Sequence, residues 1–276
     1  MIFAFLNSRF CLIFFFPLVL GSLTVFSFEP FNYSFINFLL LPALFLLTTH
    51  VQKKSKNTYR KKPYLLNLFL IGYLFGVGFF LMGTHWISNS LTFDENFKFL
   101  IPISLILIPS FLGVFFGFGN LIVGPFLKNN FSSVLLFSSS FAFMDFLRAK
   151  LFTGFPWNLW AYSWSHTPET LQLLPIVGFF SFNLICIIFS CSLLLLIFKK
   201  KIDIIIFVLI ALTFFGNFIY GSSVTEKNDK YLEKIKLNSE NSAFVKIISP
   251  SFELKYNLSN EDLIANISKL IRYSGP

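Results

Sequence analysis

Few residues of this 276-residue sequence could do chemistry. A cysteine acts as a nucleophile only as a thiolate, which needs a nearby base or cation. Cys11, Cys186 and Cys191 lie in apolar runs instead, and no spacing of histidine, cysteine and acidic residues fits a metal site. We therefore interpret the three cysteines as small apolar side chains, none of them catalytic, and we expect neither a metal nor a cofactor.

One acidic and one basic residue, Asp145 and Arg148, stand three positions apart in an otherwise apolar run. Residues three apart on a helix face each other, and charges inside a membrane span are rare and are usually paired or functional. The simpler interpretation is a neutralised structural pair that fixes one helix against its neighbours. The alternative places Arg148 where the phosphate of a lipid headgroup would lie.

Residues 152–178, which we call the aromatic shelf, hold three of the four tryptophans. The polar-edged rings of this stretch are Trp157, Trp160, Tyr162, Trp164 and His166. Such rings settle where hydrocarbon meets water, and the prolines at 156 and 168 interrupt a helix. We predict an ordered, non-helical shelf at a membrane face, followed by a new helix. A plain aromatic belt is the alternative.

The elements that would hold these residues are apolar helices. The sequence is 55% hydrophobic and only 13% charged, whereas about a quarter of the residues in a soluble domain are charged. Several apolar runs reach the roughly 20 residues that a helix needs to cross a bilayer, and no alternating pattern suggests a barrel. We therefore predict an all-helical polytopic membrane bundle.

About seven transmembrane helices are predicted within a domain over residues 1–222. Their approximate bounds are 10–27, 34–50, 64–88, 99–126, 131–148, 170–198 and 202–221. The first run could be a cleaved signal peptide. We favour a retained helix, because no basic region precedes Arg9 and no small-residue cleavage site follows.

The basic residues predict the orientation of the chain. Six of them lie in the loop 53–62, which contains no acidic residue, and such loops stay in the cytoplasm. This places the N-terminus inside and residues 152–168 and 223–276 outside, in the periplasm if the membrane is a bacterial inner membrane. The net charge of +9 therefore orients helices, and we expect no nucleic-acid partner.

Glycines mark two of the predicted spans. Gly72 and Gly76 form a GxxxG pair, and Gly113 and Gly117 repeat that spacing in the next span. Small residues let helix backbones approach closely in a membrane, so we expect helix packing and not a phosphate-binding loop. Trp86, which follows the first pair, would either anchor the interface or face a substrate cavity.

The chain after residue 222 changes in composition. We predict a polar linker, a short strand over 243–249, and a helix that begins with a capping box at Ser259 and Asp262. Strand, loop and helix open an α/β layered domain. One strand and one helix cannot bury each other's apolar faces, so we expect residues 223–276 to form an incomplete domain.

Three segments of the sequence resemble the N-terminal half of bacterial apolipoprotein N-acyltransferases. These are GYLFGVGFFLMGTHWIS at 72–88, FMDFLRAKLFTGFPW at 143–157 and VKIISPSFELKY at 245–256. The TGFPW stretch at 153–157 is the most specific of them. The sequence departs from the family at 249–253, where a Gln-Pro-Asn-type run is shorter, and at Tyr256, where the family has tryptophan.

The resemblance implies an acyltransferase with a membrane domain and a nitrilase-like (carbon-nitrogen hydrolase) domain. In the family, a cysteine thioester carries an acyl chain from a phospholipid to the α-amine of a diacylated lipoprotein. The glutamate base, lysine and cysteine nucleophile belong to a part that this sequence does not include. We therefore expect no acyl transfer by this chain alone, which would be truncated or completed by a second polypeptide.

The residues expected to face lipid or substrate surround the shelf. They are Trp86, Arg148, Phe155, Pro156, Trp157, Tyr162 and Tyr256. Two other functions stay open. A non-catalytic membrane scaffold or small transporter would show broken or charged helices near the bilayer midplane and internal repeats, which the sequence lacks. The membrane half of another nitrilase-type enzyme would differ only in sequence that is not included here.

Overall fold

The protein is built from helices. The computed structural model describes residues 8–58, 64–237, 245–252 and 258–275. None of these residues forms a strand. Five helical segments are long and apolar enough to cross a membrane: Ser34–Lys54, Tyr64–Thr92, Glu95–Phe126, Phe179–Phe198 and Lys201–Ile235. A shorter apolar helix covers Cys11–Ser27. These helices indicate a membrane protein.

The bounds of the helices follow chain order. The longer ones in the first part are α2 (Phe16–Thr24), α3 (Asn37–Thr58), α4 (Tyr64–Thr84), α5 (Ile101–Val123) and α6 (Phe131–Lys150). The later ones are α7 (Pro168–Leu171), α8 (Leu174–Val177), α9 (Phe179–Cys191), α10 (Leu193–Phe198), α11 (Lys201–Leu237) and α12 (Asn260–Ser274). A π-helical turn covers Cys11–Phe15, and 3₁₀ segments cover Val25–Ser27, Ser34–Ile36, His85–Thr92, Glu95–Leu100, Gly124–Phe126 and Trp160–Trp164.

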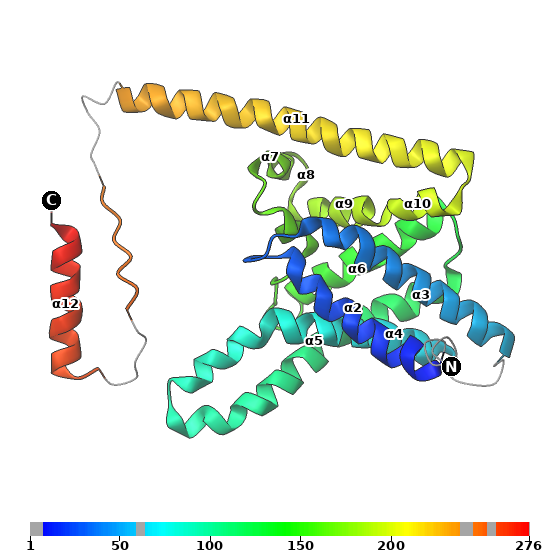
Figure 1. Ribbon diagram of the computed structural model, residues 1–276, viewed down its shortest axis with the longest axis horizontal. Helices are drawn as coiled ribbons and strands as arrows, with labels where there is room; N and C mark the ends of the chain where they lie inside the picture. Colours follow the sequence, from blue (N-terminus) through cyan, green and yellow to red (C-terminus); the bar gives the residue numbers. More distant parts are fainter. Residues whose placement is uncertain (1–7, 59–63, 238–244, 253–257, 276) are drawn as a thin grey trace.

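Figure 1 shows how these helices are arranged. Helices α2 to α6, α9 and α10 form a bundle, and α11 lies along one side of it and extends past its edge. Helix α12 lies apart from the bundle. The molecule therefore has a packed interior and a long helix at its border.

The predicted spans differ from the helices in three places. Helix α6 is not among the long apolar segments, because its serines and its charged pair lower its hydropathy. The predicted span 170–198 is divided into α7, α8, α9 and α10. The predicted span 202–221 continues as one helix to Leu237. The described residues therefore show five candidate spans, and the predicted total of about seven is not confirmed.

The tail agrees only partly with its prediction. The capping box is confirmed: Ser259 Oγ accepts a hydrogen bond from the Asp262 amide, and the Asp262 carboxylate accepts one from the Ser259 amide. The predicted strand is not formed over residues 245–249, while residues 243 and 244 lie outside the described part. The described residues offer no neighbouring strand to its amides and carbonyls, so the pairing that stabilises a strand is not made there.

Helix α4 packs closely against α2 and α5 through five glycines. A Cβ added at Gly72 would lie 2.3 Å from the carbonyl oxygen of Phe116 in α5. A Cβ added at Gly78 would lie 2.2 Å from the carbonyl oxygen of Leu18 in α2. The complete set, which we call the glycine seam, is Gly21, Gly72, Gly76, Gly78 and Gly113. The predicted role of the GxxxG pair in helix packing is confirmed.

Aromatic rings fill the space beside the glycine seam. Trp160 is 1% exposed and stacks on Phe79 with the ring centroids 5.5 Å apart and the planes 10° apart. Phe75 and Phe116 pack edge to face next to them. Because Trp160 belongs to the aromatic shelf, this cluster fixes the shelf to the core of the bundle.

Candidate functional site

The aromatic shelf is ordered but is not wholly non-helical, which corrects the prediction. It contains the 3₁₀ segment Trp160–Trp164 and the short helices α7 and α8. Pro168 stands in the first turn of α7, where the missing amide hydrogen would have no helical partner in any case. Gly154, with φ +78°, turns the chain where a Cβ would meet the carbonyl oxygen of Ala149 at 2.6 Å.

The charged pair in α6 connects this helix to the shelf. Arg148 Nη2 donates to Asp145 Oδ1 at 3.0 Å, and the two side chains are 1% and 0% exposed. Arg148 Nη1 donates to the carbonyl oxygens of Phe155 and Trp157 at 2.6 and 2.7 Å. The guanidinium also lies over the ring of Phe80, 4.9 Å from its centroid. One arginine therefore holds both sides of the Pro156 turn.

Asn183 on α9 completes this arrangement. Its Nδ2 donates to the second oxygen of Asp145 at 3.0 Å, and its Oδ1 accepts the backbone N–H of Ala161 at 3.0 Å. We call Asp145, Arg148 and Asn183 the buried polar network. The sequence prediction missed Asn183, although a lone asparagine in an apolar helix is a signal for such bonds. The network joins α6, α9 and the shelf.

The position of Arg148 bears on its two interpretations. The residue is 2% exposed, and its two terminal nitrogens contact protein oxygens. A headgroup phosphate would need access to those nitrogens. The contacts therefore support the structural pair and not the lipid-facing position.

A cavity of about 860 Å³ opens between the shelf, the end of α4 and the turn that connects α2 to α3. We call it the shelf cavity. Four of the residues predicted to face lipid or substrate line it: Trp86, Pro156, Trp157 and Tyr162. Phe155 does not line it but stacks on Trp157, with the centroids 5.4 Å apart. Tyr256 lies outside the described residues.

The lining of the shelf cavity is mainly apolar and aromatic. Its polar groups include His85 and Glu29. The Glu29 carboxylate accepts a hydrogen bond from the side-chain Nδ2 of Asn32 at 2.9 Å. The Trp86 indole N–H donates to the Gly83 carbonyl at 3.1 Å, so this ring is held in place. Apolar walls with a few fixed polar groups are typical of a pocket for an apolar ligand.

The cysteines lie away from this cavity. Cys11, Cys186 and Cys191 are free and at most 1% exposed. None of them lines the shelf cavity, and no group of three or more histidine, cysteine or acidic side chains that could hold a metal occurs among the described residues. Their burial agrees with their interpretation as small apolar side chains.

The apolar helices and the buried network place this chain among helical membrane proteins. A model of the apolipoprotein N-acyltransferase N-terminal domain matches residues 20–192, which is more than half of the chain. The chain therefore belongs to the apolipoprotein N-acyltransferase family. The matched part contains the buried polar network and all the residues that line the shelf cavity.

Curated relatives agree with the family. The chain is 29% identical over 160 residues to the apolipoprotein N-acyltransferase of Brucella melitensis, covering 57% of this chain and 30% of the relative. It is 32% identical over 178 residues to that of Rickettsia prowazekii, covering 63% and 33%. The aligned part of this chain thus spans about a third of the length of these relatives.

Proposed function

We propose that this chain is the membrane-embedded part of an apolipoprotein N-acyltransferase. The proposed reaction moves an acyl chain from a phospholipid to the α-amine of the lipidated N-terminal cysteine of a lipoprotein. The observation that supports this most is the shelf cavity, because an apolar cavity of lipid-accommodating size lies within the segment that matches the family. Both proposed substrates are lipid-anchored, so a reaction site at a membrane face is required.

The proposed domain organisation follows the family. Residues 1–222 would be the transmembrane domain with about seven spans, in which α6 and the segment Cys11–Ser27 join the five longer helices. Residues 223–276 would be a linker and the opening of the nitrilase-like domain. The proposed location is the bacterial inner membrane, with the N-terminus in the cytoplasm and residues 223–276 in the periplasm, on the basis of the basic loop 53–62.

The proposed chemistry has two steps. A cysteine thiolate, formed by proton transfer to a glutamate, attacks an ester carbonyl of the phospholipid, and the lysophospholipid leaves with a proton. The lipoprotein amine then attacks the thioester, the amide forms, and the thiol is released. A lysine and backbone donors would stabilise the oxyanion in both steps. These catalytic groups would come from the nitrilase-like part of the enzyme.

This chain's own residues would bind and orient the substrates. Trp86, Trp157 and Tyr162 would contact the donor lipid, with Pro156 shaping the wall between them. Phe155 would act from behind, through its stacking on Trp157. The buried polar network would keep this wall in place, since Arg148 holds the carbonyl of Trp157.

We also propose that this chain transfers no acyl group by itself. Each of its cysteines is buried, and the hydrogen bonds of the described residues give none of them a carboxylate or histidine partner. The nucleophile would come either from further sequence of the same protein or from a second polypeptide. To test this, the purified chain is mixed with a phospholipid and a diacylated lipopeptide, and product is followed by mass spectrometry. Any turnover above that of boiled protein contradicts the proposal.

A chimera tests the family function directly. Residues 20–192 of this chain, which match the family's N-terminal domain, replace the corresponding segment of the Brucella melitensis enzyme, and N-acylation is measured in the same assay. We expect turnover from the chimera and a loss of at least tenfold when Trp157 is changed to alanine. If the chimera folds and binds lipopeptide but shows no turnover, the proposed function is contradicted and the alternative of a non-catalytic membrane scaffold is favoured.

A further inference from the structure

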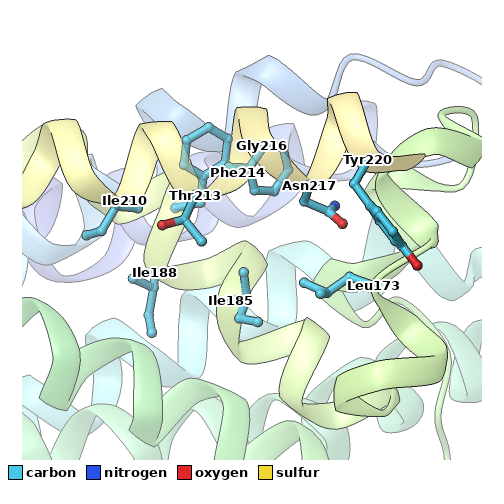
Figure 2. Close-up of a pocket in the computed structure, with 10 residues that line it drawn as sticks. Leu173, Ile185, Ile188, Ile210, Thr213, Phe214, Gly216, Asn217 and Tyr220 are labelled. Atoms are coloured by element: carbon cyan, nitrogen blue, oxygen red, sulfur yellow. The ribbon is translucent and has the colours of Figure 1, made fainter. Parts of the chain in front are cut away.

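A second hollow lies between α9 and α11, shown in Figure 2. It has a volume of about 430 Å³ and shares no lining residue with the shelf cavity. Its walls are mostly apolar: Ile185 and Ile188 face it from α9, and Ile210, Phe214 and Tyr220 are among the residues that face it from α11. We call it the α9–α11 groove.

The groove exists because α11 is held to the bundle only at certain points. Near the shelf, Asn217 Nδ2 donates to the Thr170 carbonyl at 2.9 Å, and a Cβ added at Gly221 would lie 1.9 Å from the Glu169 carbonyl oxygen. Phe214 stacks on Phe189 with the ring centroids 3.9 Å apart. The first two contacts fix α11 to α7 and the third fixes it to α9, and the groove lies open beside them.

Gly216 lies at the wall of this groove and has no packing role that the structure accounts for. A Cβ added there would meet no atom within 4 Å, whereas every glycine of the glycine seam would bring its Cβ within 3 Å of a neighbouring helix. Glycine lowers the helix propensity of a position relative to alanine. The missing side chain at Gly216 therefore leaves open space and brings no described residues into closer contact.

The membrane that would surround α11 limits which molecules could occupy the α9–α11 groove. The helix is long and apolar enough to cross a membrane, and only 11% of its apolar window is buried inside the protein. A groove of about 430 Å³ does not admit a helix, whose diameter with side chains is about 10–12 Å. In a bilayer, the molecules that reach such a groove are lipids.

The direction of the groove fits one lipid tail. It extends along α11 from Tyr220 to Ile210, and the ten helical steps between these two residues rise by about 15 Å. One leaflet contributes half of a hydrocarbon core that is about 30 Å thick. Tyr220 and Asn217 lie at the end beside α7, where a polar edge suits an interface. The residues that follow toward Ile210 are apolar except for Thr213, whose hydroxyl donates to the Leu209 carbonyl within α11.

We propose that the α9–α11 groove binds one acyl chain of a bilayer phospholipid, with the headgroup end at Tyr220 and the tail directed toward Ile210. Binding comes from apolar contact along the tail. It therefore depends little on the headgroup and does not require that the chain takes part in acyl transfer. The lipid separates α9 from α11 where no side chain does.

Photolabelling tests the proposal on the full chain. The protein is placed in nanodiscs of phosphatidylcholine that carries a diazirine in the middle of one acyl chain, and the labelled residues are mapped by mass spectrometry. We expect labelling of Ile185 and Ile188. Gly216→Leu, which fills the groove from α11, should reduce it at least fivefold, and Gly216→Ala should reduce it less. Labelling of Leu212, which is 62% exposed on α11, should not change.

Two further variants keep the test decisive. Ile188→Trp fills the groove from α9 and should reduce the labelling of Ile185. Ile219→Phe adds bulk on α11 outside the groove and should leave labelling of Ile185 and Ile188 as it is. Equal labelling of Ile185 in the wild type and in a folded Gly216→Leu or Ile188→Trp protein overturns the proposal, as does a cross-link from the groove to a second copy of the chain. Replacing phosphatidylcholine by phosphatidylglycerol should preserve the pattern.

Discussion

Helices α4 and α11 are both apolar, yet they are packed in opposite ways. Half of the apolar window of α4 is buried, against 11% for α11. The glycines of α4 bring backbones together, since a Cβ at Gly76 would lie 2.7 Å from Gly113 Cα. Gly216 of α11 borders open space instead. Glycine in these helices therefore has two different settings, close contact between backbones in α4 and the wall of an open groove in α11.

The largest expected effect comes from the tightly packed side of this comparison. Changing Asp145 to alanine leaves the Arg148 guanidinium buried without its carboxylate, which costs about 3–5 kcal/mol when a buried pair is broken. The free energy of unfolding would be measured by titration with sodium dodecyl sulfate in mixed micelles, followed by circular dichroism. The matched control is Glu95→Ala, because Glu95 pairs with Lys98 but is 85% exposed. If the two substitutions lowered the unfolding free energy equally, the buried pair would contribute no more to stability than an exposed one, which contradicts the prediction.

The second prediction compares the two kinds of glycine directly. Gly72→Leu places its Cβ 2.3 Å from a backbone oxygen of α5, and overpacking of this kind costs about 1–3 kcal/mol or more. Gly216→Leu meets no atom within 4 Å of its Cβ, so the unfolding free energy should not fall. Both variants are measured in the same micelle titration. A loss at residue 216 as large as that at residue 72 would mean that α11 is as tightly packed as α4.

A smaller effect is expected in the opposite direction. Gly216→Ala improves helix propensity and adds only one methyl group to open space. It should raise the unfolding free energy by up to about 1 kcal/mol. Gly76→Ala is its control, since a Cβ there would lie 2.7 Å from Gly113 and should destabilise the protein. If the two alanine substitutions changed the unfolding free energy in the same direction and by a similar amount, the free space beside the glycine would not explain the difference between α4 and α11.

The smallest effect concerns the bond that holds α11 to the shelf. Asn217→Ala removes the donor to the Thr170 carbonyl, and hydrogen bonds between membrane helices average about 0.6 kcal/mol. The more sensitive measurement is the distance between spin labels at Leu212 and Leu184, which should become more widely distributed as α11 loosens. Ser222→Ala serves as control, because the Ser222 hydroxyl donates within its own helix, to the Phe218 carbonyl. An unchanged distribution would show that α11 is held elsewhere.

The features that were predicted correctly from the sequence depend on local spacing. The four-residue spacing of Gly72 and Gly76 indicated the glycine seam, and the capping box preceded α12 as predicted. The three-residue spacing of Asp145 and Arg148 placed the two charges together. In each case the residues of the motif lie within about one turn of the same helix, so a single sequence contains the necessary information.

The features that were missed depend on contacts between distant segments. Arg148 binds carbonyls of the shelf, and carbonyls have no side-chain signal. Asn183 reaches Asp145 from a helix 38 positions away. The division of the span 170–198 into four helices follows from turns at residues such as Gly178, whose φ is +77°. The groove beside Gly216 could not be predicted, because it is defined by where α9 and α11 do not touch.

The length of α11 has a consequence for the chain that follows it. A helix of 37 residues measures about 55 Å, whereas the hydrocarbon core of a bilayer is about 30 Å thick. If α11 crosses upright, roughly 25 Å of continuous helix is left over for the headgroup layer and the water beyond it. From residue 223 to Leu237, a continuous helix then takes the place of the polar linker that the composition predicted. The close approach of Gly221 to the Glu169 carbonyl therefore fixes the direction in which α11 leaves the bundle, as far as Leu237.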